Sequence, residues 1–146
     1  MRLEFFMPMV PPTITAQERR IGVRGGKPFF YDPPELKAAK AKLRDHLAAH
    51  VPAEPFTGAV QLVTKWCWPC GDEHADGEWK ITTPDTDNLV KAPKDLMEKL
   101  GFFTNDALVA SEVIEKFWAR VPGIYVCITD LSATELSNSE RGAHEL

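Results

Sequence analysis

Residues 83–101 read TPDTDNLVKAPKDLMEKLG, and this stretch decides the fold. Its apolar side chains recur at helical spacing, at Leu89, Leu96, Met97 and Leu100. The spacing predicts a helix over about 88–100 with one face turned to a core. Gly101 is placed as the C-terminal cap, and Phe102 can fold back on Met97, as such caps often require.

Strands are predicted on both sides of this helix. After it, residues 108–118 and 123–130 read as two strands that join at Pro122. Before it, a strand over 58–66 leads into a long polar connection over 69–83. The helix therefore lies between segments that can pair in one sheet.

The front of the chain adds a strand, a basic loop and a second helix. A strand over 2–9 is stopped by two prolines, and the Arg- and Gly-rich segment 13–28 is a loop or loose hairpin that returns through 29–31. Prolines 33 and 34 then begin a helix over 35–50. This order predicts an α+β fold, a single small domain with a mixed β-sheet and two main helices, over residues 1–130. Residues 131–146 are expected to form a flexible C-terminal tail.

Length and composition limit the function classes. The 146 residues fit one compact domain, and the 44% hydrophobic content excludes disorder for most of the chain. No apolar run is long enough to span a membrane, and the N-terminus lacks a signal peptide, so a cytoplasmic protein is expected. Three cysteines, an odd number, do not make a disulfide scaffold.

Charge is unevenly distributed along the chain, whose formal net charge is −4. Residues 1–50 hold nine Lys/Arg and five Asp/Glu, whereas residues 51–146 hold eight and sixteen. A basic front and an acidic back suit a protein that holds a phosphate backbone with one and a divalent metal with the other. An uneven solvated surface explains the distribution equally well, so charge alone does not decide.

Asp85 and Asp87 are the first candidates for chemistry. In an extended chain they point the same way, roughly 7 Å apart. Carboxylates that close favour a cation between them, and hard oxygen ligands favour Mg²⁺ or Mn²⁺ over zinc. The alternative is that Asp87 caps the helix and Asp85 lies in a solvated turn. Spacing alone favours this alternative, because Asp-x-Asp before a helix is common.

Two further residues flank the same helix. Asp106 follows it, where an isolated Asp is usually a turn residue, and spacing leaves open whether the chain returns it to Asp85 and Asp87. Lys91 lies four residues after Asp87, which predicts an ordinary ion pair on one helix face. In a metal nuclease, such a lysine can orient the attacking water or neutralise charge on the phosphorus centre.

Other patterns carry less chemistry. Cys67 and Cys70, with His74, form only one ligand pair, whereas a structural zinc site needs four ligands. Cys127 is expected in the core of the last strand. No glycine-rich nucleotide loop and no nucleophile elbow is present, so nucleotide and serine chemistry have no support.

Two blocks of the sequence together resemble the RusA-type Holliday junction resolvases. They are residues 84–91, PDTDNLVK, and residues 101–107, GFFTNDA, with a helix between them. The family shows Asp-x-Asp-Asn-Leu-x-Lys, a helix, and then Gly-aromatic-x-x-Asp-Asp. Lys116 and the opening strand with its Pro-Pro also fit, and the Arg-rich segment resembles the phage-type branch of the family. The resemblance covers most of residues 1–130.

The resemblance implies a homodimer that cuts four-way DNA junctions by symmetrical, metal-assisted nicking. It implies that Asp85, Asp87 and Asp106 are ligands of Mg²⁺, for which Mn²⁺ can substitute, and that Lys91 assists catalysis. Two positions depart from the family pattern. Asn105 replaces the first acid of the Asp-Asp pair, and Pro93 lies inside the expected helix, where it forces a kink or a later start.

The leading hypothesis is a Mg²⁺-dependent endodeoxyribonuclease that resolves four-way junctions in DNA recombination and repair. The basic loop would hold phosphates through four side chains: Arg19, Arg20, Arg24 and Lys27. Two alternatives remain open: a catalytically inactive, structure-selective DNA-binding protein, and a Mg²⁺-dependent nuclease that acts on flaps or forks. An inactive DNA-binding protein would not need all three acids, and all three are present.

Overall fold

The central sheet has four strands in the order β1-β6-β4-β5. The computed structural model describes residues 1–15 and 20–131, and all statements about structure concern these residues. The strands are β1 (Arg2–Pro8), β4 (Val60–Pro69), β5 (Val109–Ala119) and β6 (Gly123–Asp130). β4 shows strict alternation of buried and half-buried residues through Trp68, as expected for a strand with only one face on the core.

The sheet is mixed because of how its strands are connected. β4 and β5 run parallel, since the helix α2 (Thr86–Leu100) crosses between them. β6 is antiparallel to β4, and β1 is antiparallel to β6. The α+β class and the mixed sheet with two main helices, in one small domain, are confirmed.

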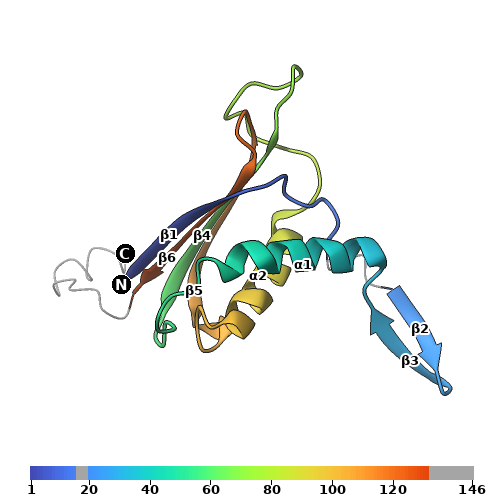
Figure 1. Ribbon diagram of the computed structural model, residues 1–146. Helices are drawn as coiled ribbons and strands as arrows, with labels where there is room; N and C mark the ends of the chain where they lie inside the picture. Colours follow the sequence, from blue (N-terminus) through green and yellow to red (C-terminus); the bar gives the residue numbers. More distant parts are fainter. Residues whose placement is uncertain (16–19, 132–146) are drawn as a thin grey trace, which may run out of the picture.

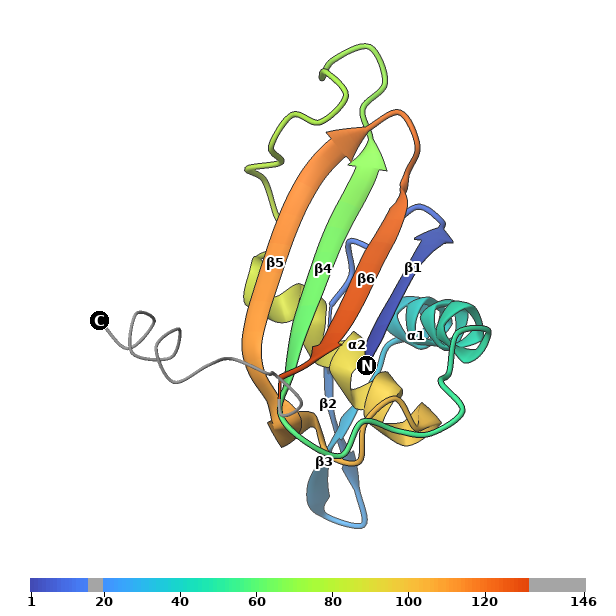
Figure 2. The same cartoon turned by 90° about the vertical axis from the view of Figure 1, so that its left-hand side faces the viewer.

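Both helices lie on the same face of the sheet (Figures 1 and 2). α1 (Pro34–Ala48) turns Leu36, Leu43 and Leu47 inward, as its apolar spacing predicted. The core fills the space between helices and sheet, and its largest fully buried side chains include Trp66, Phe102 and Phe103. No helix in the described part of the chain has the length and apolarity that crossing a bilayer requires.

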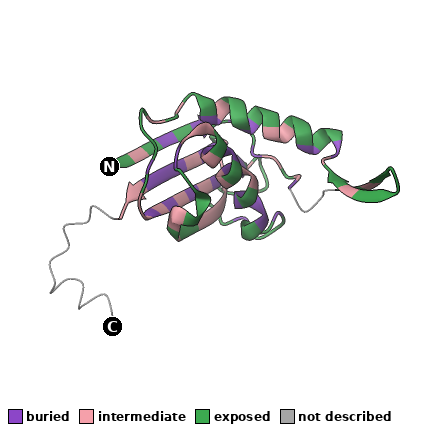
Figure 3. Ribbon diagram, turned by 90° about the horizontal axis from the view of Figure 1, so that it is seen from below, coloured by how far each residue is buried: buried purple, intermediate pink, exposed green. Residues whose placement is uncertain are grey.

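A two-stranded hairpin stands apart from this body. β2 (Arg20–Arg24) and β3 (Lys27–Tyr31) pair only with each other and project beyond the end of α1 (Figure 1). Figure 3 shows the hairpin almost wholly exposed. Gly25 and Gly26, both at positive φ, form its two-residue turn. The predicted hairpin is thus confirmed.

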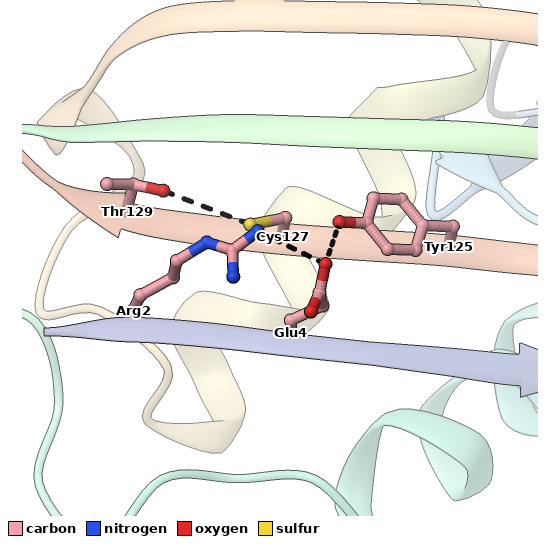
Figure 4. Close-up of polar contacts among 5 residues, drawn as sticks. All are labelled: Arg2, Glu4, Tyr125, Cys127 and Thr129. Carbon is pink, nitrogen blue, oxygen red and sulfur yellow. Dashed lines mark hydrogen bonds and ion pairs between the residues drawn. The ribbon is translucent and has the colours of Figure 1, made fainter.

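The second face of the sheet carries polar side chains (Figure 4). The Tyr125 hydroxyl donates to the Glu4 carboxylate, and this hydrogen bond raises the pKa of Tyr125 to about 12. Arg2 pairs with Glu4 at 3.2 Å between Nη2 and Oε2. Cys127 is buried, but its Sγ lies on this polar face, 3.8 Å from Thr129 Oγ1. Its predicted burial in the last strand is confirmed, although the period of two turns its side chain away from the helices.

Several predicted boundaries need correction. α2 begins at Thr86 rather than near residue 88, and it continues through Pro93, so the later start expected from that proline is wrong. β4 ends at Pro69, three residues beyond the predicted strand, because Trp68 also packs into the core. The predicted tail lies outside the described residues except for Leu131.

Gly101 ends α2 as predicted. It adopts φ 96°, and the N–H groups of Gly101 and Phe102 both donate to the Met97 carbonyl, at 3.1 and 2.8 Å. Phe102 is fully buried, so the chain turns into the core directly after the helix.

We expect Gly101→Ala to lower the free energy of unfolding by about 1–2 kcal/mol, because an L side chain disfavours this backbone conformation. An added Cβ would meet no atom within 4 Å, so the cost is conformational rather than steric. Urea unfolding measures the change, and Gly101→Asn, which tolerates left-handed backbone, should lose less. Equal stability of the Gly and Ala proteins would contradict this account.

Candidate active site

Asp85 and Asp87 stand at the N-terminal end of α2, and both are exposed. Asp85 is the N-cap residue, and its backbone carbonyl accepts the N–H groups of Asn88 at 3.1 Å and Leu89 at 3.2 Å. Its carboxylate makes no capping hydrogen bond. Asp87 lies in the first turn, where the helix dipole favours negative charge. Two carboxylates therefore face solvent at one end of one helix.

Both local interpretations of this pair need correction. Asp87 does not cap α2, because Asp85 occupies that position. The extended spacing is also wrong, since α2 already includes Thr86 and Asp87 and successive helical residues turn about 100°. The pair shares the first turn of a helix instead of one side of a strand.

The side chains after Asp87 point into the protein. Asn88, Leu89 and Val90 are all buried, and Asn88 and Leu89 line a narrow groove together with Leu36. This burial fixes how α2 is rotated about its axis, so the acids are held outward by the packing of the residues that follow them.

Lys116 holds the segment that leads to Asp85. Its Nζ, on β5, donates to the backbone carbonyls of Thr82 at 2.7 Å and Pro84 at 2.8 Å. Pro84 is buried and directly precedes Asp85. A single ammonium thus fixes two points of the backbone next to the acid, from a strand that is 34 residues away from Thr82 in sequence.

Lys80 supports the same segment from below. Its residue is only 7% exposed, its Nζ lies over the rings of Trp68 and Trp118 at 5.2 and 4.3 Å, and it donates to the Thr82 hydroxyl. Burial lowers the pKa of Lys80, and the nearby charge of Lys116 lowers it further. Nothing in the sequence indicated this role for Lys80, because its ring partners come from other strands.

If Asp85 holds Mg²⁺, as the family resemblance implies, we expect Lys116→Met to weaken activity about 10- to 100-fold, the usual effect of removing a group that orients a metal ligand. The loss should include a higher Mg²⁺ requirement, while affinity for DNA in the absence of metal stays unchanged. Cleavage titrated with Mg²⁺ and binding in EDTA measure the two effects. Lys116→Arg, which keeps the donors, should recover part of the activity. An unchanged Mg²⁺ requirement in the Met variant would refute the role.

Lys91 is exposed one turn after Asp87. The two are at i,i+4, but within the described chain they form no ion pair, so that interpretation is wrong. The neighbouring lysine on the helix, Lys94, does pair, with Glu112 of β5 at 3.2 Å. Lys91 therefore presents an unengaged ammonium beside the acids.

Asp106 lies at the other end of α2. It is the first residue of the short helix η2 (Asp106–Leu108), and its N–H donates to Glu98 Oε1 at 2.8 Å. The side chain of Asn105 accepts the N–H of Ala107 and so caps η2. Asn105, at the position where the family pattern has a further acid, therefore serves as the N-cap of η2. Asp106 is exposed.

One chain does not bring all three acids together. Asp87 and Glu98 are separated by about 16 Å along the helix axis, and the reach of the Glu98 side chain does not close this gap. Ligands of one Mg²⁺ lie within roughly 4 Å of each other. Accordingly, no group of three His, Cys, Asp or Glu side chains in residues 1–15 and 20–131 is arranged to hold a metal ion.

Cys67 and Cys70 do not form a zinc centre with His74 in this structure. His74 pairs with Glu78 at 2.6 Å and stacks on Trp118 with ring centroids 4.0 Å apart. Burial raises the pKa of the Cys67 thiol, which keeps it protonated. His74 packs against Trp118 near the end of the sheet.

The basic side chains predicted to bind DNA lie on the hairpin. Arg20, Arg24 and Lys27 are all exposed, and Arg24 lies over the Phe29 ring with 5.0 Å to its centroid. Arg19 lies outside the described residues. Arg24 and Lys27 are cross-strand partners beside the turn, and Arg20 lies on the same side four residues before Arg24, so one side of the projecting ribbon is positively charged.

Comparison with known proteins shows the family of this chain. Residues 10–129 match the family model of the endodeoxyribonuclease RusA. The chain belongs to the RusA endodeoxyribonuclease family. As an endodeoxyribonuclease, it hydrolyses phosphodiester bonds of DNA.

Two relatives share 29% identity with this RusA family member. An uncharacterized protein of Bacillus subtilis, YqaN, matches over 130 residues, 81% of this chain and 91% of its own length. A protein of Lactococcus phage r1t named crossover junction endodeoxyribonuclease rusA matches over 119 residues, 75% of this chain and 83% of its own.

Proposed function

We propose that this RusA family member is a Mg²⁺-dependent endonuclease that resolves four-way DNA junctions by paired phosphodiester hydrolysis in recombination and repair. The observation that carries the proposal is the placement of Asp85 and Asp87. Both carboxylates are exposed on the first turn of α2, outside any capping bond, and Lys116 anchors the backbone that precedes them. The name of the phage relative, crossover junction endodeoxyribonuclease, supports the junction as substrate.

The donor set fits a hard divalent cation. Asp85 and Asp87 would hold Mg²⁺, or Mn²⁺ in its place, through carboxylate oxygens, with Asp106 as a third ligand. When bound, the ion supplies activated water and neutralises charge on the phosphate. Lys91, with its unengaged ammonium on the next turn, would hold a phosphate oxygen beside the acids.

A homodimer would bring the three acids together although, in one chain, Asp106 lies at the opposite end of α2 from Asp85 and Asp87. In a dimer with a two-fold axis, the α2 helices of two copies can run in opposite directions, and each end of one helix then faces the opposite end of the other. Asp106 of one copy would lie beside Asp85 and Asp87 of its partner. The dimer would therefore contain two equivalent sites, as symmetrical cutting of opposed strands requires.

The hairpin would provide much of the affinity for DNA. Its three described cations, Arg20, Arg24 and Lys27, suit phosphate contacts, and nothing acidic lies between them on the ribbon. Phosphate contacts position DNA without reading its sequence, and binding through them weakens steeply with salt. The net charge of −4 makes this local concentration of positive charge more important.

The deciding experiment is cleavage of a labelled synthetic four-way junction beside matched linear duplex, flap and fork substrates, with and without Mg²⁺. Paired nicks in the junction alone, and only with metal, would support the proposal. Preferential cutting of flaps or forks would mean that these structures, and not four-way junctions, are the substrate. Tight binding of the junction without cutting, in Mg²⁺ and Mn²⁺ alike, would mean that the protein binds branched DNA without cleaving it.

A further inference from the structure

The projecting hairpin has two chemically different faces. Cross-strand pairing joins Ile21 with Phe30 and Val23 with Pro28, so these four side chains share one face. The opposite face carries the cations, together with the rings of Phe29 and Tyr31. Gly22 lies beneath those rings, and a Cβ there would come within 2.8 Å of Phe29, so the glycine keeps them flat against the ribbon. We call the two sides the apolar face and the basic face.

The apolar face is left open in the described chain. Ile21, Val23 and Phe30 are 64%, 74% and 68% exposed. The hairpin pairs with no other strand, and an isolated two-stranded ribbon is marginally stable in water. An exposed apolar cluster of this kind marks a binding surface.

The size and surroundings of the apolar face identify its ligand. A stable protein interface takes about 20–30 residues from each partner, whereas this face offers four side chains. Any ligand that covers it also lies next to the arginines and lysine of the basic face, which suits a polyanion. The surface of a base pair is flat and apolar and is flanked by phosphates, so it matches both faces of one thin ribbon.

We propose that the apolar face of the β2–β3 hairpin stacks on the base pairs exposed at a DNA branch point, while the basic face holds the adjoining phosphates. The inference rests on the proposed function and adds the element that distinguishes a junction from linear DNA. Apolar side chains that enter a base stack gain contact with unstacked bases. In linear duplex the base pairs cover one another except at the ends, so this contact is lost and only the phosphate contacts remain.

The test is the double variant Ile21→Thr/Phe30→Thr, which removes one cross-strand pair of the apolar face while threonine retains a preference for strands. Val121→Thr is the matched control, because Val121 is also exposed, at 66%, but lies outside the hairpin. Fluorescence anisotropy in EDTA measures affinity for a four-way junction and for linear duplex of the same sequence. A 2-aminopurine base at the branch point reports stacking directly.

We expect the affinity of the double variant for the junction to fall by about 10-fold or more, the effect of losing one stacked base. Its affinity for linear duplex should equal that of wild type. The 2-aminopurine signal change seen with wild type and with Val121→Thr should disappear. A double variant that keeps both its junction preference and this signal would overturn the inference. So would a shift from dimer to monomer in sedimentation, because the face would then contact a second copy.

Failure of the proposed function gives a different result. In that case wild-type protein itself shows no preference for the junction over duplex, whereas failure of the inference alone leaves that preference intact in both proteins. The variant Arg24→Gln, on the basic face, should weaken binding of the junction and of linear duplex by the same factor. Its effect therefore separates phosphate binding from stacking.

Discussion

Asp87→Asn should reduce junction cleavage by at least about 10³-fold, since removing a direct metal ligand should exceed the 10- to 100-fold effect of its supporting groups. Binding of the junction in the absence of metal should be unchanged or stronger, because the variant removes negative charge from a surface that meets phosphate. Single-turnover cleavage in Mg²⁺ and anisotropy in EDTA measure the two quantities separately.

Asp95→Asn is the control on the same helix. Asp95 is exposed and, within residues 1–15 and 20–131, pairs only with Lys99, at 2.9 Å on the surface, so its loss should leave cleavage near wild type. Normal cleavage by Asp87→Asn would remove the metal assignment. A comparable loss in Asp95→Asn would show that any charge change on α2 impairs the protein.

A mixture of two inactive variants should regain activity. Neither Asp87→Asn nor Asp106→Asn alone would have a complete site, but a mixed dimer pairs the intact Asp85 and Asp87 of one chain with the intact Asp106 of the other. Random assortment makes about half of the dimers mixed. Each mixed dimer holds one complete site and one that lacks two acids, so it should nick one strand and leave the junction unresolved.

The product distribution shows whether each active site takes its acids from both copies of the dimer or from one chain. Nicked junctions from the mixture, with neither variant active alone, would support sites shared between copies. No recovery after the subunits are exchanged would mean that the three acids act within one chain, after α2 or η2 has moved. Mixing Asp85→Asn with Asp87→Asn is the control, because both changes fall on the same side of the shared site and no dimer is complete.

The sequence predicted elements best where a local rule and the core agree. The end of α2 was correct because Gly101 and the buried Phe102 both require it. Its start was misplaced by two residues, because two aspartates there can each be the N-cap residue and only the structure shows that Asp85 holds that position. β4 was predicted too short, since its alternation of buried side chains continues to Trp68, which packs beneath Lys80.

For the candidate site, too, local patterns were predicted from the sequence and tertiary contacts were not. The acids were found from a compact pattern within 22 residues of sequence, from Asp85 to Asp106. Their separation along α2 was not, because it depends on a hydrogen bond from Asp106 to Glu98 that no spacing encodes. The support from Lys80 and Lys116 also depends on tertiary contacts, in which strands distant in sequence meet at the Thr82 backbone.

The length of α2 has a geometric consequence for the products. In the proposed dimer, each end of the antiparallel helix pair carries one complete set of acids, so the helix acts as a ruler between the two scissile phosphates. Its 15 residues correspond to about 22 Å. The offset between the two incisions is then a property of helix length, and an α2 lengthened by one turn would move them apart by about 5 Å.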